Sequence, residues 1–155
     1  MKAHYRTATF QDGLIVASNL RPEDKKELER MGLSLLHVAL GIFESEHPTA
    51  IISPDGDVCG VAGVVPLGNK VGQIWLLCTP DISKAPIAFF RQAKVWLESI
   101  QKNYILLWNH CDSTNKVHHN LLKFLGFKAI HKVYIGPELF PFYEIVKLCV
   151  PSQPQ

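Results

Sequence analysis

The sequence predicts a mixed α/β domain with about seven strands and about four helices, in which an antiparallel meander leads into a central parallel pair. Short apolar runs suited to strands alternate with amphipathic helical stretches along the chain. Two apolar runs flank the turn Asp55-Gly56, which is typical of a hairpin. One long amphipathic stretch, residues 85–100, joins two further apolar runs, as a helix does when it connects parallel strands.

Composition predicts one globular domain over residues 1–150 and a disordered tail over residues 151–155 (PSQPQ). The 155 residues are 47% hydrophobic and 19% charged, and the formal charge of +2 is too small to indicate a nucleic-acid surface. The chain has no apolar run of 18 residues, so we expect no membrane span. The N-terminal stretch MKAHYRTATF lacks an apolar signal region, so we expect a protein made and kept in a cytoplasm.

The first third of the chain predicts one strand followed by helices. Residues 4–10 alternate and are rich in β-forming side chains. Asp12 is the candidate cap of a short helix. A second helix begins at Pro22, where a first helical proline is tolerated, and ends at Gly32. An apolar helical face then covers residues 33–43, before a His-Pro breaker closes the helical part.

The stretch Tyr104–Phe127 is expected to form the functional edge. It reads as a buried strand, a polar turn over Asn109–Asn115 and an amphipathic helix that ends at Gly126. Ligands of α/β proteins tend to bind where a strand ends and a helix begins. The other strands are expected at residues 49–53, 58–66, 71–79, 128–135 and 142–150.

Arg21, Asp24 and Glu27 are spaced by three residues, so one helical face can present all of them. They form either a polar site or a solvated helix start with surface ion pairs. Such exposed pairs are typically worth about 0–1 kcal/mol. Spacing alone leaves both interpretations open.

Other polar and aromatic residues also have two interpretations. Asn115 is a natural helix N-cap and a candidate ligand contact. Trp75 and Trp108 are expected to pack the core, although either is suited to the floor of a pocket. His110, Cys111, His118 and His119 are candidate metal ligands, but zinc sites usually have close pairs of ligands at fixed spacing. The adjacent His118 and His119 point to different helix faces, so we expect no metal site. The four cysteines are far apart in sequence, which favours buried thiols over disulfides.

The order of elements resembles the GNAT N-acetyltransferase fold. Asn115, followed by Leu125-Gly126-Phe127, has the spacing of the Asn and the Leu-Gly-Phe helix end in that family. The chain further resembles a phage-encoded branch of the fold, the internal virion protein A family of short-tailed phages. The residues that carry this second resemblance are Asn19-Leu20-Arg21-Pro22, Asp24, Glu27, Gly63–Pro66, Ile74–Leu77, Thr79, Phe89-Phe90-Arg91, Leu107–Phe127, Gly136-Pro137 and Phe140–Phe142.

The GNAT resemblance implies a cleft for acetyl-CoA between the fourth and fifth strands. Residues that would then contact the cofactor are Trp75, Leu77, Thr79, Ser83, Lys84 and Asn109. The segment 79–86 departs from the family pattern, because it has no glycine, two prolines and one aspartate. Leu122 stands where many members carry a tyrosine that acts as the general acid.

The resemblance implies Arg21, Glu27, Asn115 and His118 as candidate catalytic residues, with His110, His118 or Glu27 as alternative bases. The departures from the family pattern favour a phage protein with degenerate acyl-CoA chemistry that acts in assembly of the virion core. Its partners would be virion or assembly proteins, in the host cytoplasm or the virion, and neither nucleic acid nor membrane is expected. The alternative is an active acetyl-CoA-dependent N-acyltransferase that modifies an amine of a protein or small molecule.

Overall fold

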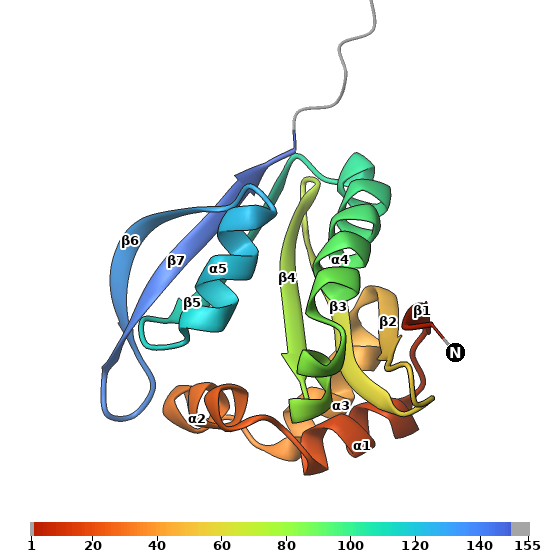
Figure 1. The fold of residues 1–155 in the computed structure, drawn as a ribbon. Helices are drawn as coiled ribbons and strands as arrows, with labels where there is room; N and C mark the ends of the chain where they lie inside the picture. Colours follow the sequence, from red (N-terminus) through yellow and green to blue (C-terminus); the bar gives the residue numbers. More distant parts are fainter. Residues whose placement is uncertain (1, 150–155) are drawn as a thin grey trace, which may run out of the picture.

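One seven-stranded mixed sheet with helices on both faces organises the computed structural model, which describes residues 2–149 (Figure 1). The strand order is β1-β2-β3-β4-β5-β7-β6. The strands are β1 (His4–Thr7), β2 (Glu46–Ile52), β3 (Val58–Gly68), β4 (Val71–Cys78), β5 (Leu106–Asp112), β6 (Lys128–Ile135) and β7 (Phe140–Leu148). The predicted tail at residues 151–155 lies outside the described residues.

The sheet contains an antiparallel meander, β1 to β4, followed by the parallel pair β4–β5. This confirms the predicted fold class. The described residues form five α-helices rather than about four, with two short 3₁₀ helices. The α-helices are α1 (Phe10–Ser18), α2 (Pro22–Met31), α3 (Leu35–Glu44), α4 (Pro86–Ile100) and α5 (Lys116–Phe124), and the 3₁₀ helices are η1 (Pro80–Lys84) and η2 (Gln101–Asn103).

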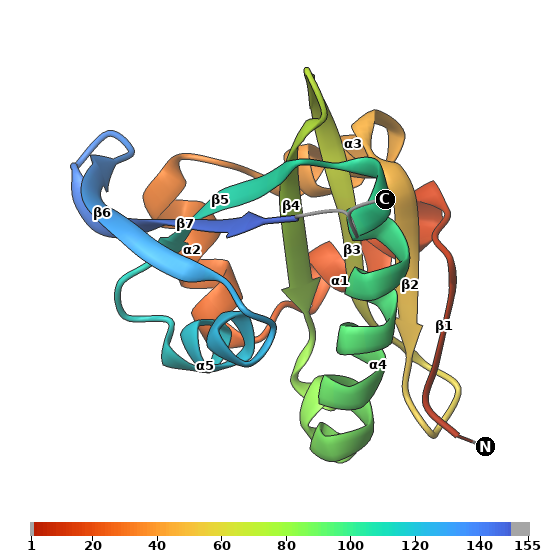
Figure 2. The same cartoon turned by 90° about the horizontal axis from the view of Figure 1, so that it is seen from above.

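The helices cover the sheet from two sides, and α2 lies beside the open end of the β4–β5 pair (Figures 1 and 2). Helices α1 and α3 pack on one face through a cluster that includes Val16, Val38 and Leu77. Helices α4 and α5 pack on the other face. None of the helices in the described part of the chain has the length and apolar character needed to cross a membrane.

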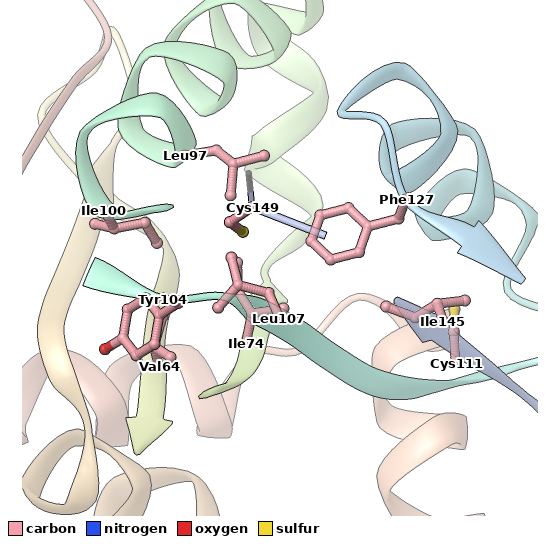
Figure 3. Close-up of a cluster of buried hydrophobic side chains, with 10 residues drawn as sticks. All are labelled: Val64, Ile74, Leu97, Ile100, Tyr104, Leu107, Cys111, Phe127, Ile145 and Cys149. Atoms are coloured by element: carbon pink, nitrogen blue, oxygen red, sulfur yellow. The ribbon is translucent and has the colours of Figure 1, made fainter. Parts of the chain in front are cut away.

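The cluster under α4 and α5 holds β4, β5 and β7 together (Figure 3). Leu107 of β5 is fully buried in it, next to Leu97 of α4 and Phe127 after α5. Burying side chains of this size contributes about 1.5–3 kcal/mol each. The core therefore fixes the two strands of the parallel pair, and with them the space between their ends.

The start of the chain differs from its prediction. The first strand stops at Thr7 instead of residue 10, because Thr9 caps α1. The Asp12 N–H donates to Thr9 Oγ1, and the Asp12 carboxylate accepts from the Thr9 N–H. Asp12 is therefore the inner member of a capping box and not the cap itself.

The predicted polar turn at 109–115 is also wrong in its first half. Strand β5 continues to Asp112, because its residues pair with β7 from Leu106↔Leu148 to Asp112↔Phe142. Tertiary pairing thus outweighs local polarity. The His-Pro pair at 47–48 lies within β2, at a register shift, where a strand tolerates proline.

The end of α5 agrees with its prediction. Gly126 has φ +94°, a left-handed conformation that glycine adopts without strain. The N–H of Gly126 donates to the Lys123 carbonyl and the N–H of Phe127 to the Leu122 carbonyl. This Schellman motif directs Phe127 into the core.

Candidate functional site

The two parallel strands β4 and β5 separate beyond their first three pairs. Their register runs from Val71↔Leu106 to Gln73↔Trp108. Asn109 lies at the point of divergence, where its Nδ2 donates to the Ile74 carbonyl at 2.6 Å and its Oδ1 accepts from Gln73 Nε2 at 3.3 Å. Asn109 therefore clamps the strands where the gap opens.

The far end of β4 is closed by the start of α2. The N–H of Arg21 donates to the Cys78 carbonyl at 2.9 Å, and the Cys78 N–H donates to Asp24 Oδ2 at 2.8 Å. Alternate residues of a strand direct their peptide groups to the same edge. Leu76, between Ile74 and Cys78, therefore presents its N–H and C=O to the gap.

A cavity of about 430 Å³ fills the gap and reaches both faces of the sheet. Phe89, Trp96 and Leu121 line it on the side of α4 and α5, and Met31 and Gly41 line it on the side of α2 and α3. Its walls are largely apolar, with a few polar side chains. This is the usual character of a site for a small molecule or cofactor.

Asp24 is the centre of a buried hydrogen-bond network at the edge of this cavity. Its side chain is 0% exposed. Asp24 Oδ1 accepts from Arg21 Nη2 at 2.9 Å and from Asn115 Nδ2 at 3.2 Å. Asn115 Oδ1 accepts from Arg21 Nη2 at 3.1 Å and from the His118 N–H at 3.4 Å. The network ties α2 to the start of α5, so Asn115 is both a helix cap and a tertiary link.

These contacts decide between the two interpretations of the α2 residues. Arg21, Asp24 and Glu27 are 6%, 0% and 7% exposed, so a solvated helix start is wrong. Buried charges at a helix start are costly unless they are paired and hydrogen-bonded, as they are here. All three side chains are buried on one side of α2, and their use as a functional site stays a prediction.

Glu27 and His118 reach the cavity wall together. His118 Nδ1 lies 3.9 Å from Glu27 Oε2, and His118 Nε2 lies 3.8 Å from Asp24 Oδ1. Glu27 Oε1 accepts from the Asp112 N–H at 2.7 Å. Burial raises the pKa of Glu27 above its usual value, although His118 and the Asp112 N–H act to lower it. The raised pKa makes Glu27 a stronger base than an exposed glutamate.

A second ion pair, between half-buried Arg30 and buried Asp112, lies beside the site. Arg30 Nη1 donates to both carboxylate oxygens of Asp112 at 3.1 and 3.2 Å. Asp112 Oδ1 also accepts from the N–H and hydroxyl of Thr114, which starts the turn into α5. The Arg30 guanidinium lies 4.3 Å from the centre of the Phe140 ring. Helix α2, strand β5 and the β6–β7 hairpin are thus fixed to each other.

The structure divides the six predicted cofactor residues into two groups. Trp75, Leu77 and Asn109 line the cavity. Trp75 Nε1 donates to Ser45 Oγ at 2.6 Å, which orients the indole toward α3. The other three, Thr79, Ser83 and Lys84, belong to the segment around η1.

The segment around η1 does not form a loop of free N–H groups. Thr79 caps η1 by accepting from the Asp81 N–H at 3.3 Å, and Ser83 Oγ donates to the Pro80 carbonyl at 2.9 Å. Lys84 pairs with Asp55 and Asp81. An anion would have to compete with these two carboxylates for Lys84. All three side chains are exposed, so a diphosphate that bound here would draw Lys84 from surface ion pairs.

The remaining candidates lie at the cavity wall. His110 and Leu122 both line the cavity. His110 Nε2 lies 3.8 Å from Glu144 Oε2, and burial lowers its pKa while Glu144 opposes that shift. Leu122 packs against the core under α5. All four cysteines are free and buried, as predicted.

Sequence reasoning missed Arg30 and Asp112, and it considered Cys111 as a buried thiol and as one of four possible metal ligands. Arg30 continues the spacing of three that begins at Arg21, so the periodicity carried a signal. Asp112 carried no such signal in the sequence, because it lay inside the predicted polar turn. Cys111 reaches the site because β5 extends beyond its predicted end.

Comparison with solved structures identifies the fold. Ard1 from Thermoplasma volcanium superposes with a TM-score of 0.72 at 12% identity, covering 97% of this chain and 99% of that chain. An acetyltransferase of the GNAT family from Bacillus anthracis gives 0.67 at 11% identity and 96% coverage of both chains. Spermidine N-acetyltransferase from Vibrio cholerae, in complex with CoA and spermine, gives 0.64 at 11% identity and 95% coverage of both.

No sequence model of a protein family matches the chain, and no curated protein sequence matches it. The structural similarity nevertheless extends over nearly the whole chain. The protein therefore has the GNAT N-acetyltransferase fold, as the order of its elements and the Asn115 to Phe127 pattern predicted.

Proposed function

We propose that the protein is an acyl-CoA-dependent N-acyltransferase that works in the gap between β4 and β5. The observation that carries this proposal is the cavity in that gap, with Glu27 and His118 on its wall. The spermidine N-acetyltransferase from Vibrio cholerae, solved in complex with CoA and spermine, has a similar fold, and this similarity supports the proposal. The departures of the sequence from the family pattern favour a role in virion assembly over this activity.

The apolar part of the cavity suits the narrow arm of an acyl thioester. The edge of β4 offers the peptide groups of Leu76, and Trp75 and Leu121 offer apolar surface. When bound, an acyl-CoA would supply an acyl thioester that an amine can attack. The chain's part is to exclude water from the gap, to orient the donor along β4 and to take up the proton that the amine loses.

His118 and Glu27 are the proposed proton acceptors. Both border the cavity, and His118 Nε2 is buried without a hydrogen-bond partner among the described residues. Asp24 lies 3.8 Å from this nitrogen and would stabilise the charge that His118 acquires. Arg21 and Asn115 hold Asp24 in place and are positioning residues.

Steady-state release of thiol from acetyl-CoA, measured with a panel of primary amines in a chelator-containing buffer, tests the proposal. Positioned general bases contribute about 10²–10⁴-fold. His118→Gln should therefore lower kcat by at least about 100-fold. The matched control is His131→Gln, because His131 is exposed on β6. Equal rates for wild type and His118→Gln, or no release with any amine, would refute the proposal.

The structure of the segment around η1 favours a second candidate. Because Lys84 pairs with two carboxylates, the end of the cleft that would meet a diphosphate is weakly suited to it. A scaffold with the GNAT fold does not need such a site, and virion assembly is the role that the sequence resemblance implies. Particles made with and without the protein test that role. Unchanged particle composition and infectivity would argue against it.

A further inference from the structure

Three side chains with metal-binding atoms converge at the cavity wall from three different elements. Glu27 of α2, Cys111 of β5 and His118 of α5 each bring one donor atom to within 4.8 Å of the other two. Their sequence positions, 27, 111 and 118, contain no short ligand pair. Only the fold, through the extension of β5 to Asp112, brings them together.

One of the three separations is close to that of a metal centre. Tetrahedral bonds of about 2.0–2.3 Å to nitrogen, oxygen and sulfur place ligand atoms roughly 3.3–3.8 Å apart. His118 Nδ1 and Glu27 Oε2 are 3.9 Å apart. The other separations do not exceed 4.8 Å, so side-chain rotations that shorten them by about 1 Å would close the triangle around an ion.

The charges around the three side chains favour a cation. The cluster contains the buried groups of Arg21, Asp24, Glu27 and Asp112 and the half-buried guanidinium group of Arg30. With all of them ionised, the cluster has one more negative than positive charge. An unpaired buried charge is costly, so a proton or a cation must balance it.

One further observation fits an ion bound to His118 Nδ1, the ring nitrogen nearer Glu27. The other nitrogen, Nε2, is buried and has no hydrogen-bond partner within residues 2–149, and Asp24 lies 3.8 Å from it. With an ion on Nδ1, Nε2 would carry the ring proton toward Asp24, as carboxylates orient metal-bound imidazoles. Cys111 lies at one end of the core cluster beside Ile145 (Figure 3).

We propose that Glu27, Cys111 and His118 bind one divalent cation of the zinc class, with a fourth coordination position open to the cavity. Thiolate and imidazole ligands favour zinc over magnesium or calcium. Binding would form bonds to sulfur, nitrogen and oxygen and release the Cys111 proton to solvent. This inference does not rest on the proposed acyl transfer. In an active acyltransferase, the cation would occupy the lone pairs of Glu27 and His118 and would inhibit.

Co²⁺ is the probe, because a cobalt–thiolate bond gives a charge-transfer absorption band in the near ultraviolet. We expect one equivalent of Co²⁺ to produce this band with the intact chain, and Zn²⁺ to displace it. Cys111→Ala should abolish the band, and His118→Gln should weaken Zn²⁺ binding at least about 10-fold. Circular dichroism checks that each variant is folded.

The matched controls are Cys59→Ala, a buried thiol in a separate cluster, and His131→Gln, an exposed histidine on β6. Both should bind Co²⁺ and Zn²⁺ as the wild type does. The proposal is overturned if the wild type gives no band. It is also overturned if His118→Gln leaves Zn²⁺ affinity unchanged, or if the Cys59 variant loses the band as fully as the Cys111 variant. None of these readouts requires acyl-transfer activity, so failure here and failure of the proposed function are distinguishable.

Discussion

Replacing Asn115 by alanine tests the link between α2 and α5. Asn115 is 1% exposed, caps α5 and bonds to both Arg21 and Asp24. Loss of the cap costs about 1 kcal/mol. Leaving the two buried charged partners short of a hydrogen bond costs about 1–3 kcal/mol more. We expect Asn115→Ala to lower the free energy of unfolding by about 3 kcal/mol.

The assay is urea unfolding with thermal melting as a second measure. For a chain of this size, about 3 kcal/mol corresponds to a fall in Tm of roughly 6–12 °C. Asn115→Ser keeps a capping oxygen and should recover about 1 kcal/mol of this loss. The control is Asn120→Ala, an exposed position on the same helix, which should stay within about 0.5 kcal/mol of wild type. A loss below about 1 kcal/mol for Asn115→Ala would refute the tertiary role and leave only the cap.

Two other predictions follow from backbone and charge. Gly136 has φ +85°, and an added Cβ would lie 1.7 Å from the Arg30 carbonyl oxygen. Gly136→Ala should therefore lower the free energy of unfolding, measured in urea, by at least about 2 kcal/mol. Gly68, at φ +90° with open space around it, is the control, and equal losses for the two alanine variants would contradict the clash. At Asp12, burial acts to raise the pKa, but hydrogen bonds from Arg6 and Thr9 outweigh it and hold the pKa below the usual 3.8. The ionised Asp12 therefore stabilises the native state above pH 3.8, and this contribution is lost as pH falls through the folded pKa. The difference in free energy of unfolding between wild type and Asp12→Asn should thus disappear in acid. A difference that stays constant across the titration would contradict this role of Asp12.

Periodicity and turn chemistry predicted most of the fold. The Asp-Gly hairpin, the helix between the parallel strands and the glycine after α5 depend on local sequence, and all three are present. The course of residues 109–112 could not be predicted, because pairing with β7 outweighs their polarity. The capping role of Thr9 was missed in favour of Asp12, since both residues of a capping box carry the same signal.

The site was predictable only in part. The spacing of Arg21, Asp24 and Glu27 indicated one face of a helix, but not that this face is buried. Burial depends on Asn115, 91 residues beyond Asp24 in sequence, which no local pattern connects to α2. The approach of Cys111 to Glu27 and His118 depends likewise on the three-dimensional fold.

Binding of acetyl-CoA in the β4–β5 gap tests the central claim most directly. Titration calorimetry on the wild type should give one site, and thermal shift should show stabilisation of about 2.7 kcal/mol at one hundred times the dissociation constant. Leu122→Trp, which fills the cavity, should abolish both signals, whereas Leu148→Trp, at a residue 68% exposed on β7, should retain them. No binding to the wild type, or equal binding to the two tryptophan variants, would contradict a functional acyl-CoA cleft.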